Sequence, residues 1–385
     1  MKIINGKYTS AKLFADIIEE TAIEQIEALC NSIQFKDCKV SVMPDVHAGS
    51  GCTIGTVIDC RLDNIAPQLV GVDLNCGLSI ACLGTEKIDL VKLDSIIREK
   101  IPSGFNIHKD KEYDMTIDVT KLKCYTAISR DIANFSDKFY MSIGTLGGGN
   151  HYIELNVDDN GVQYLTVHSG SRGPGLMIAE YYIKLAKLYA PEYTTPVLPR
   201  DVAACYLHDV ELMHEYTIVN RFKILSIITQ ALGLSNIKTP YNVTHNYIEK
   251  LSEDTYRIRK GAISAKAGEF VAIPLNMRDG VIFGTGKGNE EWLQSAPHGG
   301  GRLMSRKKAK RHLNLVDFKE DMNGVYTTCV DETTLDESPR AYKPMASIVD
   351  GIKDTVDITG ILKPVYNFKA GGQKKYKLDL SQNRL

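Results

Sequence analysis

Residues 71–77 read Gly71-Val72-Asp73-Leu74-Asn75-Cys76-Gly77, and this run ties the fold of the chain to its chemistry. It follows the apolar stretch Pro67-Gln68-Leu69-Val70 and ends at a glycine, a layout that predicts a strand edge presenting a carboxylate and a thiol three residues apart. Taken alone, the pair also fits an ordinary turn. Similar polar clusters containing imidazoles recur along the chain, and they are Asn150-His151-Tyr152-Ile153-Glu154, Val167-His168-Ser169-Gly170-Ser171-Arg172-Gly173, Thr244-His245-Asn246 and Pro297-His298-Gly299-Gly300-Gly301-Arg302.

The composition bounds the class of protein. The 385 residues, 43% of them hydrophobic, suffice for one large domain or two ordinary ones with a substantial core. The net charge of -1 predicts no global attraction to nucleic acid, so a polyanion would need a local basic patch. Nine irregularly spaced cysteines argue against a disulfide framework and for a reducing compartment. The chain lacks an apolar run typical of a signal peptide or membrane span, and we expect a cytoplasmic protein without membrane contact.

Hydrophobic periodicity predicts an α+β fold. Helices are expected over 10–32, 88–100, 176–190, 208–232 and from about Arg302 through 311, and strands over 39–43, 161–167, 270–275 and 280–284, with a polar turn at 44–47. Residues 101–140 show no clear pattern and are a candidate surface excursion. Because the polar clusters extend from residue 45 to residue 302, dividing the chain would cut the candidate site apart. We therefore predict a single domain over residues 1–385, with mixed sheets flanked by helices.

The clusters have the composition of a transition-metal site. Thiolate is a soft ligand, imidazole a borderline ligand and carboxylate a hard one. One or two divalent ions could be held by Asp73, Cys76, His151, His168 and His245. Two ions about 3.5–4 Å apart are the usual clamp for phosphoryl transfer. Any one of these histidines could equally be a hydrogen-bonded structural residue, and the prediction rests on the whole set.

A candidate nucleophile lies further along the chain. His298 precedes three glycines and Arg302 at the expected start of a helix, where phosphate groups bind readily. A histidine there can attack phosphorus and form a phosphoramidate, with Asp45 as a possible orienting partner for its ring. Arg172, in its glycine-rich run, can chelate a phosphate in bidentate fashion. The alternative is that the glycines form only a tight turn and that His298 is a surface side chain.

The basic run Arg306-Lys307-Lys308-Ala309-Lys310-Arg311 could contact a nucleic-acid backbone, although a solvated helix face explains it equally well.

Taken together, these motifs resemble the RtcB family of RNA-splicing ligases, from about Met43 to Lys369. Besides the runs quoted above, the resemblance is carried by Met43-Pro44-Asp45-Val46-His47, Gly147-Gly148-Gly149-Asn150-His151, Arg259-Lys260-Gly261-Ala262, Met304-Ser305-Arg306 and Ala341-Tyr342-Lys343. The resemblance implies an enzyme that joins an RNA 3′-phosphate, or 2′,3′-cyclic phosphate, to a 5′-hydroxyl with GTP and manganese. It identifies the RNA ends as the partner and leaves any activating protein unidentified.

The resemblance also assigns roles to residues. Cys76 would bridge two Mn²⁺ ions, His168 and His245 would complete the shell of one, and Asp73 and His151 that of the other. His298, oriented by Asp45, would be guanylylated and pass the guanylyl group to the RNA 3′-phosphate, after which the 5′-hydroxyl displaces GMP. The guanosine would be held by Asn150, Glu154, Tyr342 and Lys369, and phosphates of nucleotide or RNA by Arg172, Arg302 and Arg306.

This chain departs from the family pattern at three places. Leu275-Asn276-Met277-Arg278-Asp279-Gly280 stands where many members have Gly-Ser-Met-Gly, so Asn276 would replace a nucleotide-contacting serine. His-Gly-Gly-Gly-Arg replaces the usual His-Gly-Ala-Gly-Arg, and a basic tail, 370–385, extends past the end of many members. The resemblance as a whole implies RNA repair, tRNA splicing or both. The departures predict a divergent branch that is devoted to repair of cleaved RNA and not to tRNA splicing.

Two other functions stay open from the sequence. The scaffold could serve a metal-dependent cyclic phosphodiesterase or phosphatase that lost nucleotidyl transfer, or a non-catalytic factor that binds RNA ends. The presence of His298, Tyr342 and Lys369 favours the ligase.

Overall fold

The computed structural model describes residues 1–110, 117–235 and 237–371, and its core consists of two large sheets. The first has the strand order β1-β2-β3-β4-β10-β9, the second the order β12-β13-β15-β6-β7-β5-β8, and β11 and β14 form a separate pair. The β2–β3 pairing is parallel and the other pairings within these sheets are antiparallel, so the first sheet is mixed. The strands are β1 (Lys2–Asn5), β2 (Ser10–Leu13), β3 (Lys39–His47), β4 (Ile54–Arg61), β5 (Gly77–Gly84), β6 (Tyr152–Val157), β7 (Gln163–Ser169), β8 (Tyr241–Thr244), β9 (Asn246–Lys250), β10 (Thr255–Lys260), β11 (Ala262–Ser264), β12 (Phe270–Pro274), β13 (Val281–Gly286), β14 (Ser295–Pro297) and β15 (Val356–Lys369).

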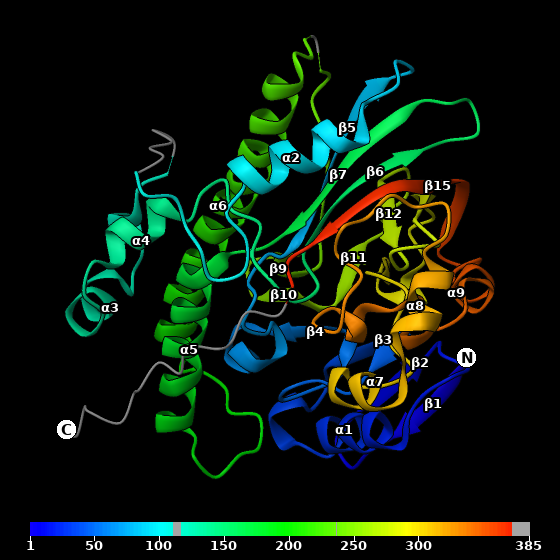
Figure 1. Cartoon of the computed structure of the whole chain (residues 1–385). Coiled ribbons are helices and arrows are strands. Elements are labelled where there is room, and N and C mark those ends of the chain that lie inside the picture. Colours follow the sequence, from blue (N-terminus) through cyan, green and yellow to red (C-terminus); the bar gives the residue numbers. More distant parts are fainter. Residues whose placement is uncertain (111–116, 236, 372–385) are drawn as a thin grey trace.

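Helices cover both flanks of the sheets. Figure 1 shows α3 to α6 gathered on one side of the molecule and α7 to α9 on the other. The longest, α6, packs against β7, β5 and α2. The helices are α1 (Glu20–Cys30), α2 (Leu90–Lys100), α3 (Tyr125–Asp131), α4 (Phe135–Met141), α5 (Arg172–Tyr189), α6 (Arg200–Leu232), α7 (Arg306–His312), α8 (Leu315–Asp321) and α9 (Met345–Gly351). The predicted α+β class with mixed sheets is therefore confirmed.

The order of the second sheet brings distant segments to one edge. Leu78 of β5 lies opposite His168 of β7, which in turn lies opposite Tyr152 of β6, and Gly77 lies opposite Thr244 of β8. Adjacent strands lie roughly 5 Å apart, so the chain segments at these strand ends converge. The metal-ligand candidates of the sequence all lie on those segments.

Several predicted elements differ from the structure. The helix expected over 10–32 is strand β2 followed by the shorter α1, because Leu13 pairs with Val42 in the first sheet. The polar turn expected at 44–47 is the end of β3, interrupted by an irregular register after Val42. Pro67–Leu69 forms a 3-10 helix, so the Asp73 run is a turn before β5 and not a strand edge.

Other predictions differ less. The helices expected over 88–100, 176–190 and 208–232 correspond to α2, α5 and α6, with earlier starts for the last two. Within 101–140 the described residues contain α3 and α4, while 111–116 lie outside them. Of the predicted basic tail, residues 372–385 also lie outside the described part. The cysteines all fall in the described ranges, and none forms a disulfide. In that same part of the chain, no helix has the length and apolarity that crossing a bilayer requires.

Candidate functional site: a metal-ligand cluster beside a nucleotide-sized pocket

Five predicted metal ligands converge where four strands of the second sheet meet. Asp73 and Cys76 lie in the turn before β5, His151 directly precedes β6, His168 is near the end of β7, and His245 lies between β8 and β9. The turn is held in place by Asn75, which has a left-handed backbone (φ 54°), a conformation that asparagine adopts more readily than most residues. Its side-chain amide donates to the Val210 carbonyl at 2.8 Å. The cluster is thereby anchored to the buried face of α6.

The donor atoms form two groups that share one thiol. Cys76, His168 and His245 make one group, and Asp73, Cys76 and His151 the other, with all donor atoms of a group within 4.8 Å of one another. Cys76 Sγ lies 3.2 Å from His168 Nε2 and 3.4 Å from His151 Nε2. Sulfur and nitrogen ligands of one tetrahedral ion would be about 3.5 Å apart, from bond lengths of about 2.3 and 2.0–2.1 Å. The spacing fits shared coordination.

Burial determines the protonation of the residues in the cluster. Burial lowers the pKa of His168 and of His245 well below the ordinary value, so both imidazoles are neutral, as ligands must be. His245 Nδ1 is buried without a hydrogen-bond partner in the described structure. Burial, followed by the nearby Asp73, raises the pKa of Cys76 well above its ordinary value, so a cation is needed to hold the thiolate. This donor set fits a divalent transition metal.

Asp73 has the character of an anionic ligand. Burial alone would raise its pKa, but His151 and then Arg172 lower it overall. Its Oδ2 lies 2.9 Å from His151 Nε2, and Ser171 donates to Oδ1 through its backbone N–H at 3.1 Å. Arg172 Nη1 lies 3.3 Å from His151 Nδ1. Because arginine only donates, the proton of His151 lies on Nε2, toward Asp73, and a cation between the two residues would replace it.

Arg172, predicted to hold a phosphate of nucleotide or RNA, lies beside the metal-ligand cluster. Its guanidinium donates to Thr145 Oγ1 at 3.2 Å and to the Gly104 carbonyl at 3.3 Å, besides contacting His151. It does not line the neighbouring pocket. These contacts place Arg172 to support His151, and they use three of the five N–H donors of its guanidinium.

The candidate nucleophile is fixed by a buried carboxylate. Asp45 is fully buried in β3, and its Oδ2 accepts from His298 Nδ1 at 2.7 Å and from the backbone N–H groups of His298 and Gly299 at 3.1 and 3.2 Å. Gly301 has φ 65°, and a Cβ there would lie 2.7 Å from the Asp45 Cα, so only glycine allows this approach. His298 Nδ1 therefore donates a proton to Asp45, and Nε2 is the ring nitrogen that this contact leaves available.

His298 does not begin a helix, contrary to the prediction. It follows strand β14, and α7 starts only at Arg306. The ring is instead placed by Asp45 and by the metal-ligand cluster, since the ring centroids of His298 and His245 are 4.8 Å apart. A helix dipole therefore has no part in phosphate binding at this residue.

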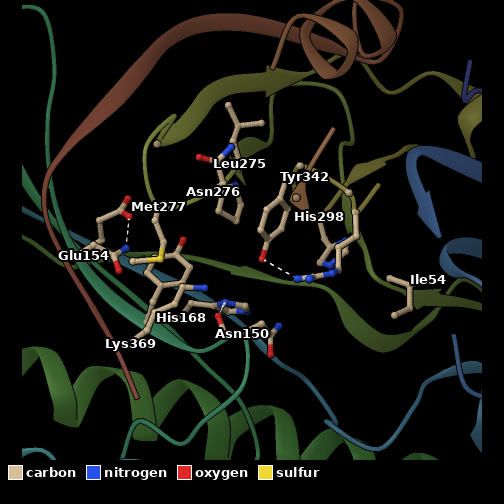
Figure 2. Close-up of a pocket in the computed structure, with 18 of the residues that line it drawn as sticks. Ile54, Asn150, Glu154, His168, Leu275, Asn276, Met277, His298, Tyr342 and Lys369 are labelled. Atoms are coloured by element: carbon tan, nitrogen blue, oxygen red, sulfur yellow. Dashed lines mark hydrogen bonds between the residues drawn. The ribbon is translucent and has the colours of Figure 1, made fainter. Parts of the chain in front are cut away.

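A cavity of about 330 Å³ opens beside His298. Figure 2 shows Glu154 and Lys369 toward one end of it and His298 toward the other, with Tyr342 between them. Apart from Arg172, every residue predicted to bind nucleotide lines this cavity, and they are Asn150, Glu154, Asn276, Arg302, Arg306, Tyr342 and Lys369. A volume of this size is in the range of small-molecule sites.

Glu337 connects the cationic residues of the cavity, and neither periodicity nor a motif marks it in the sequence. Its buried carboxylate pairs with Lys369 and Arg306, and Oε2 accepts from the Tyr342 hydroxyl at 2.8 Å. Burial would raise its pKa, but Lys369, Arg306 and Arg302 lower it to about 2. Arg302 also stacks on the Tyr342 ring, 5.0 Å from its centroid. This anion holds the cavity's cations in position.

Asn276 binds its own loop. Its Oδ1 accepts from the backbone N–H groups of Arg278 and Asp279, each at 3.0 Å, and its Nδ2 donates to Asp279 Oδ2 at 2.8 Å. These hydrogen bonds of Asn276 close a local turn at the rim of the cavity. In α7, Arg306 and Lys310 are paired with Asp336, and the exposed cations of this helix are Lys307, Lys308, Lys310 and Arg311.

Lys343 was part of a quoted motif but had no predicted role. Its Nζ, which is buried, donates to the carbonyls of Ile17 and Pro44 at 2.7 Å and of Val46 at 3.1 Å. Two of these carbonyls flank Asp45. The residue after Tyr342 therefore fixes the strand that carries the partner of His298.

Comparison with known proteins agrees with this site. The sequence model of the family described as "tRNA-splicing ligase RtcB" matches residues 28–370. The RNA-splicing ligase RtcB of Escherichia coli (strain K12) is 32% identical over 365 residues, covering 85% of this chain and 88% of that protein. The tRNA-splicing ligase RtcB of Archaeoglobus fulgidus is 26% identical, covering 96% and 93%. The match spans most of this chain and includes every residue of the cluster and of the cavity, and on this ground the chain belongs to the RtcB family.

Proposed function

We propose that this protein is an RNA ligase that uses GTP and two Mn²⁺ ions to join an RNA 3′-phosphate, or a 2′,3′-cyclic phosphate, to a 5′-hydroxyl. The observation that carries the proposal is the position of His298. Its Nδ1 is bound to buried Asp45, its ring is next to the metal-ligand cluster, and it lines the cavity. An RNA-end-binding factor has no use for a nucleophile prepared in this way, and a two-metal phosphatase that activates water does not require one.

The ions would be held by the two groups described above. Asp73, Cys76 and His151 would bind one, and Cys76, His168 and His245 the other. When bound, such ions polarise phosphoryl oxygens and lower the pKa of water or a hydroxyl group. The donor set by itself would also accept zinc, which binds such ligands more tightly than manganese does.

His298 would carry out the first step. Its Nε2 lone pair attacks the α-phosphorus of GTP, the bond to the bridging oxygen breaks, and pyrophosphate leaves. The positive charge that develops on the ring is stabilised by Asp45 through the 2.7 Å contact with Nδ1. The product is a guanylyl group joined to His298 by a phosphorus–nitrogen bond.

The cavity would position GTP for this attack. Glu154 would accept from the guanine edge, Lys369 would donate to its carbonyl oxygen, and Tyr342 would stack on the base. Asn150, Arg302 and Arg306 would bind phosphate or ribose oxygens. The Glu337 contacts of Arg306 and Lys369 show that these cations already converge on one anion, and the nucleotide would compete with it.

The remaining steps transfer the guanylyl group to RNA. An oxygen of the RNA 3′-phosphate attacks the guanylyl phosphorus, which releases His298 and activates the phosphate as a mixed anhydride. The 5′-hydroxyl then attacks the RNA phosphorus, loses its proton, and displaces GMP. A cyclic phosphate would first be hydrolysed to a 3′-phosphate by water.

Incubation with α-labelled GTP and Mn²⁺, followed by a denaturing gel, tests the proposal. We expect label on the wild type that is stable to alkali and lost in acid, as a phosphoramidate is, and no label on His298→Ala. His312→Ala, which changes an exposed histidine of α7, is the matched control and should label normally. A wild type that turns over cyclic phosphate without ever taking label would indicate the phosphodiesterase, and one that only binds RNA ends the non-catalytic factor.

The physiological substrate is proposed to be broken RNA, tRNA halves or both. Sequencing RNAs with 5′-hydroxyl ends in a deletion strain separates these. Accumulation confined to unspliced tRNA halves would contradict a repair function.

A further inference from the structure

Three neighbouring strands place a row of polar side chains at the back of the cavity. Thr166 of β7 lies opposite Glu154 of β6, and Glu154 lies opposite Asn367 of β15. All three are at most 2% exposed, as is Asn156, two residues further along β6 on the same face. Polar residues so deeply buried need specific partners or a function.

Both oxygens of Glu154 are held by amides. Asn156 Nδ2 donates to Oε1 at 2.6 Å and Asn367 Nδ2 donates to Oε2 at 2.7 Å, a contact drawn at Glu154 in Figure 2. Thr166 Oγ1 donates to Asn156 Oδ1 at 2.8 Å, which fixes the orientation of that amide. A carboxylate can only accept, so the amide nitrogens must face Glu154.

Asn367 uses only its side-chain nitrogen in the contact with Glu154. Its Oδ1 is buried and has no hydrogen-bond partner within the described residues. A purely structural asparagine in a sheet would be expected to satisfy both ends of its amide. This amide is instead oriented so that the cavity-lining carboxylate of Glu154 is fixed.

We propose that Asn367, together with Asn156, is a positioning residue that sets base specificity, by holding Glu154 as a two-oxygen acceptor for a purine edge with two adjacent N–H donors. Guanine has such an edge, whereas adenine has not, and hypoxanthine has only one of the two donors. Each Glu154 oxygen keeps a second lone pair for the ligand. This inference rests on the proposed function, because it deepens the use of the same cavity.

The charge state of Glu154 gives the inference a pH signature. Burial raises the pKa of Glu154 to about 7, although Asn156, Asn367 and Lys369 act against the shift. The charged and titratable groups that face it are Lys369 on β15 and Tyr152 on β6. Loss of the Asn367 amide removes a donor to the carboxylate, so the pKa should rise further and less of the anion should be present at pH 6.5.

Equilibrium binding of GMP and IMP to the full chain tests the inference. These nucleotides lack a pyrophosphate leaving group, so covalent capture does not interfere, and IMP lacks the 2-amino donor. For the wild type we expect GMP to bind about tenfold more tightly than IMP, as for a hydrogen bond to a charged group. Asn367→Ala should lose most of this preference, with a larger loss of GMP affinity at pH 6.5 than at pH 8.5.

Three comparisons separate specificity from folding. Asn289→Ala also removes an amide hydrogen bond, to the Asp354 carbonyl, but lies outside the cavity and should bind like the wild type. Thr166→Val frees the Asn156 amide and should reduce the preference less than Asn367→Ala does, and it serves if Asn367→Ala does not fold. Retained GMP preference with an unchanged pH dependence in both variants overturns the inference. Discrimination by a wild type that takes no label from GTP overturns the ligase proposal and supports the inference. Absence of GMP binding by a wild type that takes label overturns the inference alone, and absence of both binding and label overturns both.

Discussion

The metal-ligand cluster and the cavity lie side by side but are organised by opposite means. The cluster has buried, neutral imidazoles and a protonated thiol, with a ring nitrogen of His245 that lacks any described partner. In the cavity, by contrast, charged residues form ion pairs, since Glu337 binds both Lys369 and Arg306. One region gathers donor atoms of the kind that bind a cation, and the other contains cations that are already paired with an anion.

This difference indicates how each region would respond to its ligand. A cation entering the cluster replaces protons on Cys76 and His151, so binding is coupled to proton release. A nucleotide entering the cavity exchanges one anion for another and needs no change of protonation among the arginines. Buried pairs of the second kind fix geometry more than they stabilise the fold. Substitutions in the two regions should therefore fail in different ways.

Cys76→Ala should have the largest effect, because both ligand groups share this thiol. We expect guanylylation to fall more than about a hundredfold. A residue that binds the metal directly should affect metal affinity and activity at least as much as the residues that hydrogen-bond to the metal ligands. Manganese titration followed by electron paramagnetic resonance should show loss of the bound pair of ions. Cys82→Ala changes a cysteine of strand β5, which follows the turn that contains Cys76, and lies outside both groups, so it is the matched control. Substantial labelling by Cys76→Ala at ordinary manganese concentrations would remove the basis for a shared ligand.

Lys343→Met tests the boundary between the two regions. Burial lowers the pKa of Lys343, but its Nζ still donates to three carbonyls, two of them flanking Asp45. Methionine fills the volume without donating, so the free energy of unfolding should fall by about 3 kcal/mol, and guanylylation should slow because Asp45 loses its support. Urea denaturation and labelling measure the two effects.

The exposed Lys353, which pairs with Asp350, supplies the control for this variant. Lys353→Met should change the unfolding free energy by less than about 0.5 kcal/mol. If Lys343→Met lost stability but labelled at the wild-type rate, Lys343 would be structural only, and the two regions would be independent across Asp45.

Glu337→Gln should reveal the anion that organises the cavity. The folded-state pKa of Glu337 is about 2, below the ordinary 4.5, so its ionised form stabilises the fold above about pH 4.5 and this contribution is lost as pH falls toward 2. The contribution is on the order of 3 kcal/mol. The difference in unfolding free energy between wild type and Glu337→Gln should be constant from pH 7 to pH 5 and shrink below pH 4.5. A difference independent of pH down to pH 3 would mean that the carboxylate charge is not what matters.

The sequence predicted the chemistry of the cluster better than its surroundings. The thiol, carboxylate and imidazole residues are visible as local motifs, and the strands β7, β12 and β13 lie close to where the sequence predicts them. Glu337, Lys343 and Asn367 were missed as functional residues because their roles arise only from contacts across the chain, such as Lys343 with Pro44. The helix expected over 10–32 failed for the same reason, since pairing of Leu13 with Val42 overrides local periodicity.

Asp279→Ala should have the smallest effect and mark where the cavity network ends. Asp279 accepts from Arg278 Nε and from Asn276 Nδ2, each at 2.8 Å, in the loop that departs from the family pattern. Asn276 Oδ1 would keep both backbone N–H contacts, so the turn should persist and stability should fall by less than about 1 kcal/mol. The KM for GTP in the labelling reaction should change by no more than about twofold. Asp350→Ala, which removes the carboxylate of the exposed Asp350–Lys353 ion pair, is the control. A tenfold change in KM confined to Asp279→Ala would extend the ion-paired region to this loop and make Asn276 part of it.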